Sequence, residues 1–259
     1  MPIFGPRRID RSVLGCILTG YAKGGTTLLK DLLVQTTDMQ SGFEGGLLLA
    51  ERPADGIPEP HCGNLLRRWG IAEDFRDRYR HCPNFEAGYR LVRAEATALA
   101  DHEAPLLDKT PQYMVELADV MRRAPGTPVV TVVRDPLHVL VSWLQLDNSL
   151  DNSLAWIRAA SESLLAVLAQ PRLAASVFVV NFGDLVRDPD GTLAPLHVWL
   201  GRWPRGVDPA RKCGMPFTVG GRYRMPRGIE TDRHDMSRRC PPAELERLRC
   251  ELAREVPAA

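Results

Sequence analysis

The chain has 259 residues, of which 44% are hydrophobic and 25% are charged. These values are typical of an ordinary globular protein, and the length suits one α/β domain over residues 1–259. The formal net charge of +1 excludes a whole-protein field that would attract nucleic acid or a membrane, so local groups must bind any anion. The first apolar run, 13–18, is too short for a signal peptide or a membrane span, and the six cysteines have no CxxC spacing. We expect a cytoplasmic protein with free thiols and neither nucleic-acid nor membrane partners; its oligomeric state stays open.

The first half of the chain predicts two buried strands separated by a long, irregular connection. The apolar run at 13–18 reaches a glycine and predicts the first strand, and Leu106 and Leu107 predict the end of the second. Residues 38–104 are rich in glycine, proline and charge. Helical patterns are expected near 26–35, 63–79, 85–101 and 113–123.

The second half alternates strands with helices. Residues 127–133 are largely β-branched, which predicts a strand covered on both faces, as in a parallel sheet. Residues 177–180 predict another strand, and 202–240 are rich in arginine, glycine and proline and predict a long loop. Helices are expected at 136–146, 153–169, 193–200 and 242–255. The alternation predicts an α/β fold with a mainly parallel sheet.

The segment from Gly20 to Thr27 lies between the first strand and the first helix and predicts a phosphate-binding loop. Gly20, Gly25 and Thr27 fit the frame of a nucleotide P-loop. Thr26 stands where that loop has its lysine, and Lys23 lies inside the loop instead. Main-chain amides can still bind a phosphate, whereas binding of a magnesium nucleoside triphosphate is disfavoured. The simpler alternative is a tight glycine turn.

Three ordered segments resemble those of sulfotransferases that use 3′-phosphoadenosine 5′-phosphosulfate (PAPS). Residues 21–28, Tyr-Ala-Lys-Gly-Gly-Thr-Thr-Leu, resemble the family's 5′-phosphosulfate loop. Residues 133–143 resemble its 3′-phosphate motif, with an arginine at a strand end and a serine eight positions later. Residues 178–189 resemble a later strand-to-helix segment. The resemblance implies a P-loop-like three-layer fold and a donor site formed by Lys23, Gly24, Gly25, Thr26, Thr27, Leu28, Arg134 and Ser142. In the alternative interpretation, Arg134 is a surface arginine that pairs with the adjacent Asp135.

The segment Asp108-Lys-Thr-Pro-Gln-Tyr113 resembles one in the carbohydrate and tyrosyl-protein branches of the same family. It implies that Lys109 contacts the sulfuryl oxygens at the carboxyl end of the second strand. Pro111 stands where the small-phenol branch has its histidine base. The carbohydrate and tyrosyl-protein branches instead use a glutamate shortly after the first helix, and this resemblance implies that Glu44 is the base. Glu51 is the reserve candidate, and His61 and His102 are weaker ones. In the alternatives, Lys109 is solvated at a helix start capped by Thr110, and Glu44 is a solvated turn residue.

Residues 225–232 resemble the loop that closes over the donor's 3′ end, which assigns Arg227 and Gly228 to the donor site and 202–240 to a closing loop. Residues 38–104 are expected to shape the acceptor pocket. The implied reaction is an in-line transfer of the sulfuryl group to an acceptor hydroxyl or amine, which leaves 3′-phosphoadenosine 5′-phosphate (PAP). Lys23 would stabilise the leaving phosphate oxygen, and no metal is required. The acceptor is expected to be a small molecule or a carbohydrate. The rival hypotheses are a kinase that uses Mg-ATP and a catalytically silent nucleotide-binding protein.

Overall fold

The fold is a four-stranded parallel sheet between two layers of helices. The computed structural model describes residues 9–202, 217–219, 223–225 and 240–256. The strands are β1 (Leu14–Gly20), β2 (Leu106–Lys109), β3 (Val129–Val133) and β4 (Val177–Asn181), in the order β2-β1-β3-β4, and every neighbouring pair is parallel. All seven residues of β1 are buried, as expected for a strand covered on both faces. The prediction of a mainly parallel α/β fold is confirmed.

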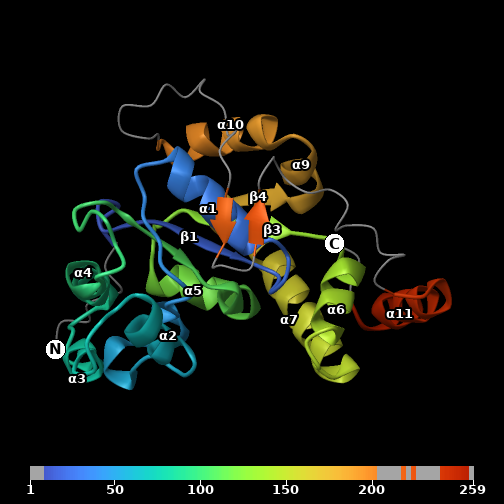
Figure 1. Cartoon of the computed structure of the whole chain (residues 1–259), viewed down its shortest axis with the longest axis horizontal. Helices are drawn as coiled ribbons and strands as arrows, with labels where there is room; N and C mark the ends of the chain where they lie inside the picture. Colours follow the sequence, from blue (N-terminus) through green and yellow to red (C-terminus); the bar gives the residue numbers. More distant parts are fainter. Residues whose placement is uncertain (1–8, 203–216, 220–222, 226–239, 257–259) are drawn as a thin grey trace.

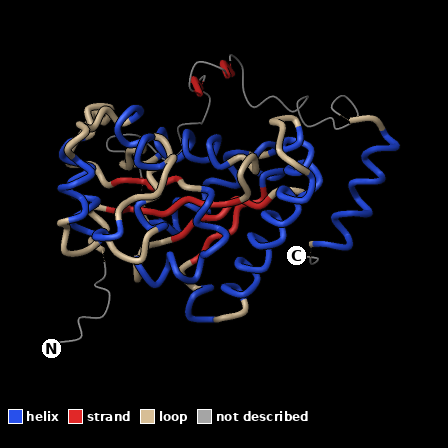
Figure 2. The backbone as a smooth tube through the Cα atoms, turned by 90° about the horizontal axis from the view of Figure 1, so that it is seen from below, coloured by secondary structure: helices blue, strands red, loops and turns tan. Residues whose placement is uncertain are grey.

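Helices cover both faces of the sheet (Figures 1 and 2), and an apolar core lies on each face. Successive side chains of a strand point to opposite faces, so Ile17 joins one core while Cys16 and Leu18 join the other. One face is covered by α1 (Thr26–Thr36), α9 (Phe182–Arg187) and α10 (Pro189–Leu200). The other is covered by η3 (Pro111–Glu116), α5 (Leu117–Arg123), α6 (Pro136–Leu144) and α7 (Leu150–Leu168).

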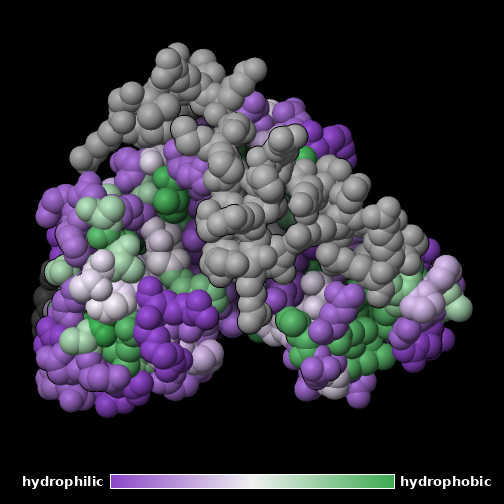
Figure 3. Space-filling model, in the orientation of Figure 1, coloured by the Kyte–Doolittle hydropathy of each residue, from purple (hydrophilic) through white to green (hydrophobic). Residues whose placement is uncertain are grey.

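Six further helices add side chains to the core on the side of α5 and α7, and η2 (Pro53–Asp55) packs beside one of them, α3. The six are η1 (Leu47–Leu49), α2 (His61–Arg68), α3 (Phe75–Arg80), α4 (Phe85–Glu95), α8 (Pro171–Ala174) and α11 (Pro242–Glu255). Apolar side chains gather where α11 packs beside α6, on the face drawn in Figure 3. None of the helices in the described part of the chain is long and apolar enough to cross a membrane.

The long helix predicted at 63–79 is wrong, because the chain turns after α2. Gly70 adopts a left-handed φ of 68°, and the amide of Ile71 bonds back to the carbonyl of Leu65 at 3.4 Å. The helix predicted at 85–101 ends at Glu95 for a related reason. The amide of Ala98 bonds to the carbonyl of Trp69 at 3.1 Å, so the chain packs against that turn instead of continuing the helix.

Three further boundaries differ from the prediction. The helix expected at 113–123 begins as a 3-10 turn, η3, before α5. The helix expected at 193–200 begins at Pro189, and α9 precedes it. Asn181 caps α9 and Asp188 caps α10, and these two caps divide the segment into two helices. The loop expected at 202–240 contains β5 (Phe217–Val219) and β6 (Tyr223–Met225), which pair antiparallel.

Candidate active site

The loop between β1 and α1 presents the start of a helix to an anion. Gly25 precedes α1 with a left-handed φ of 105°, and a Cβ there would lie 2.1 Å from the ring of Phe182. Only glycine suits both conditions. No side chain caps α1, so the first-turn amides of Thr26, Thr27 and Leu28 are left to bind a ligand or water. These amides form a potential phosphate site.

Lys23 lies at the crest of this loop, with an exposed side chain and a φ of 66° that non-glycine residues rarely adopt. Two donors hold the main chain there. Nη1 of Arg134 donates to the carbonyl of Lys23 at 3.2 Å, and Nε1 of Trp143 donates to the carbonyl of Ala22 at 2.8 Å. The surrounding structure therefore fixes a strained crest that carries a cation, which is typical of functional loops.

Arg134 follows β3 directly, and Ser142 lies on α6 beside Trp143. The guanidinium carbon of Arg134 lies 4.6 Å from the ring centroid of Phe182, the same ring that covers Gly25. Asp135, the alternative partner of Arg134, caps α6 by accepting from the amide of Leu137 at 2.8 Å. The arginine-and-serine motif thus adjoins the phosphate loop in space.

The structure brings Glu44 and Lys109 together. Nζ of Lys109 lies 2.7 Å from Oε1 of Glu44, and the two side chains are 2% and 19% exposed. The ring of Phe43 lies 4.9 Å from the same ammonium group. Lys109 pairs in register with Leu18 of β1, two residues before the phosphate loop begins at Gly20. The alternatives of a solvated Lys109 and a solvated Glu44 are both wrong.

Burial and charge act in opposite directions on Lys109. Burial lowers the pKa of its ammonium group from the ordinary value of 10.5, while the carboxylate of Glu44 raises it, and the net shift is downward. Such opposed effects on one buried lysine are typical of functional sites.

The other predicted candidates make no hydrogen bond or ion pair with Glu44 or Lys109 in the described part of the chain. Glu51 is exposed, and His102 is exposed with its Nδ1 2.6 Å from the carbonyl of Arg93. His61 is only 3% exposed and packs against Gly46, so solvent does not reach it easily. Arg227 and Gly228 lie outside the described residues.

Lys30 and Asp31 on α1 were not among the predicted site residues, although both lie near Lys109. Nζ of Lys30 lies 2.5 Å from Oδ1 of Asp31, and both charges act on the pKa of Lys109. The scarcity of lysine in the sequence was the signal that could have drawn attention to Lys30. The chain has four lysines among 33 basic residues, and the three within the described part, Lys23, Lys30 and Lys109, all belong to this region.

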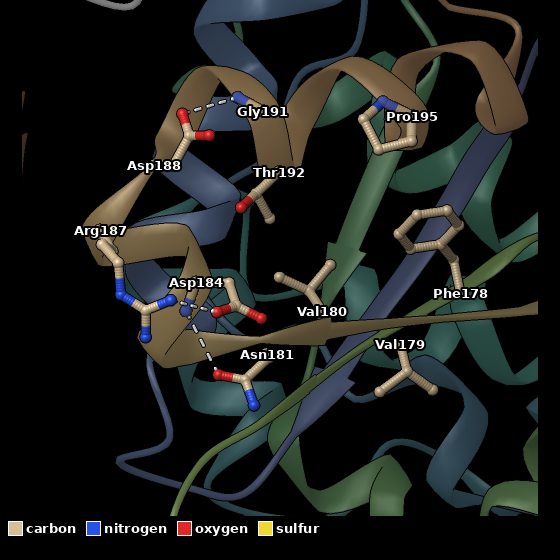
Figure 4. A pocket seen from close by; sticks show the side chains of 10 residues that line it. All are labelled: Phe178, Val179, Val180, Asn181, Asp184, Arg187, Asp188, Gly191, Thr192 and Pro195. Carbon is tan, nitrogen blue, oxygen red and sulfur yellow. Dashed lines mark hydrogen bonds and ion pairs between the residues drawn. The ribbon is translucent and has the colours of Figure 1, made fainter.

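A separate pocket of about 450 Å³ lies beside β4 and contains none of the predicted site residues (Figure 4). Asn181 accepts there from the amide of Gly183 at 2.8 Å, and Asp188 accepts from that of Gly191 at 2.9 Å. The pocket is lined by Phe178, Val179, Val180, Asn181, Asp184, Arg187, Asp188, Gly191, Thr192 and Pro195. The segment that resembles the family's later strand-to-helix motif thus forms helix caps at the sheet edge.

Comparison with solved structures supports the three-layer fold. The chain is similar to the sulfotransferase domain from the curacin biosynthetic pathway, with a TM-score of 0.57 and 18% identity over 97% of this chain and 100% of that one. It is also similar to the sulfotransferase domain of the Synechococcus PCC 7002 olefin synthase, with a TM-score of 0.56 and 19% identity over 99% of this chain and 98% of that one. A third similar structure is a sulfotransferase from Alicyclobacillus acidocaldarius, with a TM-score of 0.54 and 17% identity over 93% of this chain and 92% of that one.

A search of curated proteins gives no match. The family model described as "Sulfotransferase family", in contrast, matches residues 16–204, which is well over half of the chain. The matched range contains the phosphate loop, the pair formed by Glu44 and Lys109, and the motif of Arg134 and Ser142. The chain therefore belongs to the sulfotransferase family.

Proposed function

We propose that this sulfotransferase uses PAPS as its donor and transfers the sulfuryl group to a hydroxyl or amine of a small-molecule or carbohydrate acceptor. The observation that carries the proposal is the contact between Glu44 and Lys109, which joins a carboxylate to a buried ammonium group at 2.7 Å beside the phosphate loop. A carboxylate suits removal of the acceptor's proton, and a fixed cation suits stabilisation of sulfuryl oxygens.

The residues present fit the anionic donor. The uncapped first turn of α1 supplies amide donors for a 5′-phosphate, and the exposed Lys23 supplies a positive charge at the loop crest. The planar guanidinium of Arg134 suits a 3′-phosphate, and Ser142 offers a hydroxyl on the adjoining helix. A 3′-phosphate is also the group that distinguishes PAPS from ATP.

The donor supplies an activated sulfuryl group when bound. Lys23 would stabilise the negative charge that develops on the leaving phosphate oxygen, and Lys109 would stabilise the sulfuryl oxygens. Glu44 uses Oε1 to bind Lys109, and its Oε2 has no hydrogen-bond partner in the part of the chain that the structure describes. Oε2 is therefore the atom to which we assign the acceptor's proton.

Several further features belong to the proposal. Residues 38–104 would shape the acceptor pocket, and 202–240, with Arg227 and Gly228, would close over the donor. The Lys-Thr-Pro segment favours the carbohydrate and tyrosyl-protein branches of the family. The enzyme would act in the cytoplasm, without a metal and without nucleic-acid or membrane partners. Its oligomeric state stays open.

Calorimetric titration with PAP, AMP and ATP, each with and without Mg²⁺, tests the donor site. We expect PAP to bind far more tightly than AMP or ATP and to do so without Mg²⁺. Arg134→Ala should cost about 1.5–3 kcal/mol of PAP affinity, the scale of hydrogen bonds to a charged group. Arg187→Ala, at an exposed arginine beside β4, is the control. Preferential binding of ATP that depends on Mg²⁺ would favour a kinase and overturn the proposal.

A further inference from the structure

A buried carboxylate beside the site collects three hydroxyl protons. Asp108, the residue before Lys109, is 3% exposed. Its Oδ2 accepts from Tyr89 Oη at 2.5 Å and from Tyr113 Oη at 2.7 Å, and its Oδ1 accepts from Thr110 Oγ1 at 2.9 Å. Each hydroxyl has a single proton and donates it to Asp108, so it can only accept hydrogen bonds from its other neighbours.

Two of these hydroxyls bind the segment that follows Glu44. The amide of Gly46 donates to Thr110 Oγ1 at 3.2 Å, and the amide of Leu48 donates to Tyr113 Oη at 3.0 Å. Between them, the carbonyl of Leu47 accepts from Tyr79 Oη at 3.2 Å. Three consecutive residues of the segment are thus tied to buried side chains.

The other side of Glu44 is held from α2. Nε1 of Trp69 donates to the carbonyl of Phe43, and Nδ2 of Asn64 donates to the carbonyl of Glu44 at 3.4 Å. Side-chain donors therefore hold the main chain at Phe43 and Glu44, and two side-chain acceptors with one further donor, Tyr79, hold it from Gly46 to Leu48.

The charge of Asp108 sets the direction of the bonds on the Gly46 side. A carboxylate can only accept, so Thr110 and Tyr113 must donate to it and are left to accept from main-chain amides. Burial raises the pKa of Asp108 above its ordinary value, and the three hydroxyl donors and the nearby His61 oppose this shift by favouring the charged form. An asparagine at position 108 would donate from its side-chain nitrogen, and this donor would disturb the pattern in which Thr110 and Tyr113 donate to residue 108 and accept from main-chain amides.

We propose that Asp108 is a positioning residue, which acts through Thr110 and Tyr113 to fix residues 44–48 so that Glu44 meets Lys109. The inference rests on the proposed function, because it concerns the residue assigned there as the base. It extends that function to a second set of residues, which act through the segment that carries Glu44.

Tyr89 and Tyr113 offer a matched pair for the test. Both rings are at most 1% exposed, and both hydroxyls donate to Oδ2 of Asp108. Only Tyr113 also accepts an amide of the Glu44 segment. Tyr113→Phe and Tyr89→Phe therefore remove the same group from Asp108, and they differ in the contact that the proposal requires. Thr110→Val and Thr110→Ser form a second pair, in which serine keeps the hydroxyl.

Two measurements are made on each variant of the full chain. Amide hydrogen exchange over residues 44–48 reports on the segment directly and needs no acceptor. Release of PAP from saturating PAPS, with 4-nitrophenol and glucosamine as probe acceptors, reports on turnover. We expect Tyr113→Phe and Thr110→Val to accelerate exchange and slow turnover about tenfold, the effect of losing one hydrogen bond to the segment 44–48. Tyr89→Phe and Thr110→Ser should change both by less than about twofold. Equal effects of Tyr113→Phe and Tyr89→Phe on exchange would overturn the proposal.

Glu44→Gln separates this proposal from the proposed function. If Asp108 acts through Glu44, adding Tyr113→Phe to Glu44→Gln should slow turnover no further. Full turnover in Glu44→Gln would refute the base, and the exchange measurement would still decide whether Asp108 positions the segment. An inactive Glu44→Gln with equal turnover in the two tyrosine variants would refute the positioning role alone.

Discussion

The carboxylate of Glu44 and the ammonium group of Lys109 lie 2.7 Å apart, although 65 positions separate the two residues. Glu44 follows α1 and Lys109 ends β2, so the pair joins the start of the long segment between α1 and β2 to the end of the strand that follows it. Because β1 and β2 are parallel neighbours, their carboxyl ends lie at the same edge of the sheet, and β2 brings Lys109 to the edge where the phosphate loop begins. The contact unites the predicted base with the predicted sulfuryl-binding cation.

Glu44→Gln should lower turnover about 10²–10⁴-fold, the usual worth of a general base, because glutamine keeps the shape and loses the basicity. PAP affinity should remain nearly unchanged, since Glu44 is not assigned to the donor. Turnover is measured as PAP release and affinity by calorimetry. Glu51→Gln, at an exposed carboxylate, is the control. Normal turnover in Glu44→Gln together with an inactive Glu51→Gln or His61→Ala would place the base elsewhere.

Lys23→Ala should reduce turnover at saturating donor by at least about 10²-fold, because its charge is assigned to an oxygen that becomes more negative in the transition state. The Kd for PAP should change by less than about tenfold. Arg187→Ala removes an exposed cation from the pocket beside β4 and serves as the control. A variant that loses affinity and keeps full turnover would show that Lys23 only binds the donor.

Gly25→Ala should destabilise the protein more than Gly201→Ala does. Both glycines have positive φ, so both substitutions cost about 1–2 kcal/mol of backbone strain. A Cβ at Gly201 meets nothing within 4 Å, whereas one at Gly25 would lie 2.1 Å from Phe182 and should cost about 1–3 kcal/mol more. Urea unfolding measures the difference. Equal losses would mean that Phe182 moves aside freely.

The stability that Asp108 contributes should depend on pH. Burial raises its folded-state pKa above the ordinary value of 3.8, so the folded protein binds this proton more tightly than the unfolded chain. The stability gained from this tighter proton binding is fully present below pH 3.8 and is lost as the pH rises through the folded-state pKa of Asp108. We therefore compare the unfolding free energies of the wild type and Asp108→Asn. The difference, wild type minus variant, should fall as the pH rises from 3.8 through the folded-state pKa of Asp108 and should then become constant. Urea unfolding at a series of pH values, with the exposed Asp190→Asn as control, measures it; a rise with pH would contradict this direction.

The strands and the phosphate loop could be predicted because their signals are local. The β-branched run of β3 and the short apolar run of β1 need both faces covered, and the glycines between β1 and α1 mark the turn. Lys109 could be placed at a strand end for the same reason. The break at Gly70 was less evident, since a single glycine interrupts a helix only when tertiary contacts, here with Ala98, take up the freed groups.

The complete hydroxyl network around Asp108 could not be predicted. Asp108 and Tyr113 belong to one short segment, but Tyr89 comes from α4, and only the fold brings its hydroxyl to Asp108. The ion pair between Lys30 and Asp31 was missed for a different reason. Adjacent opposite charges on a helix are ordinary surface features, and only the fold shows that these two lie near Lys109.

Sulfuryl transfer itself is tested most directly with PAPS that carries a radioactive sulfur. The protein is incubated with this donor and a panel of hydroxyl and amine acceptors, and in parallel with Mg-ATP that carries a radioactive terminal phosphate. The account predicts labelled sulfur in an acceptor with one PAP released per transfer, and loss of this transfer in Lys23→Ala and Glu44→Gln. Labelled phosphate in the acceptor, with no sulfur transferred to any of the panel, would contradict it.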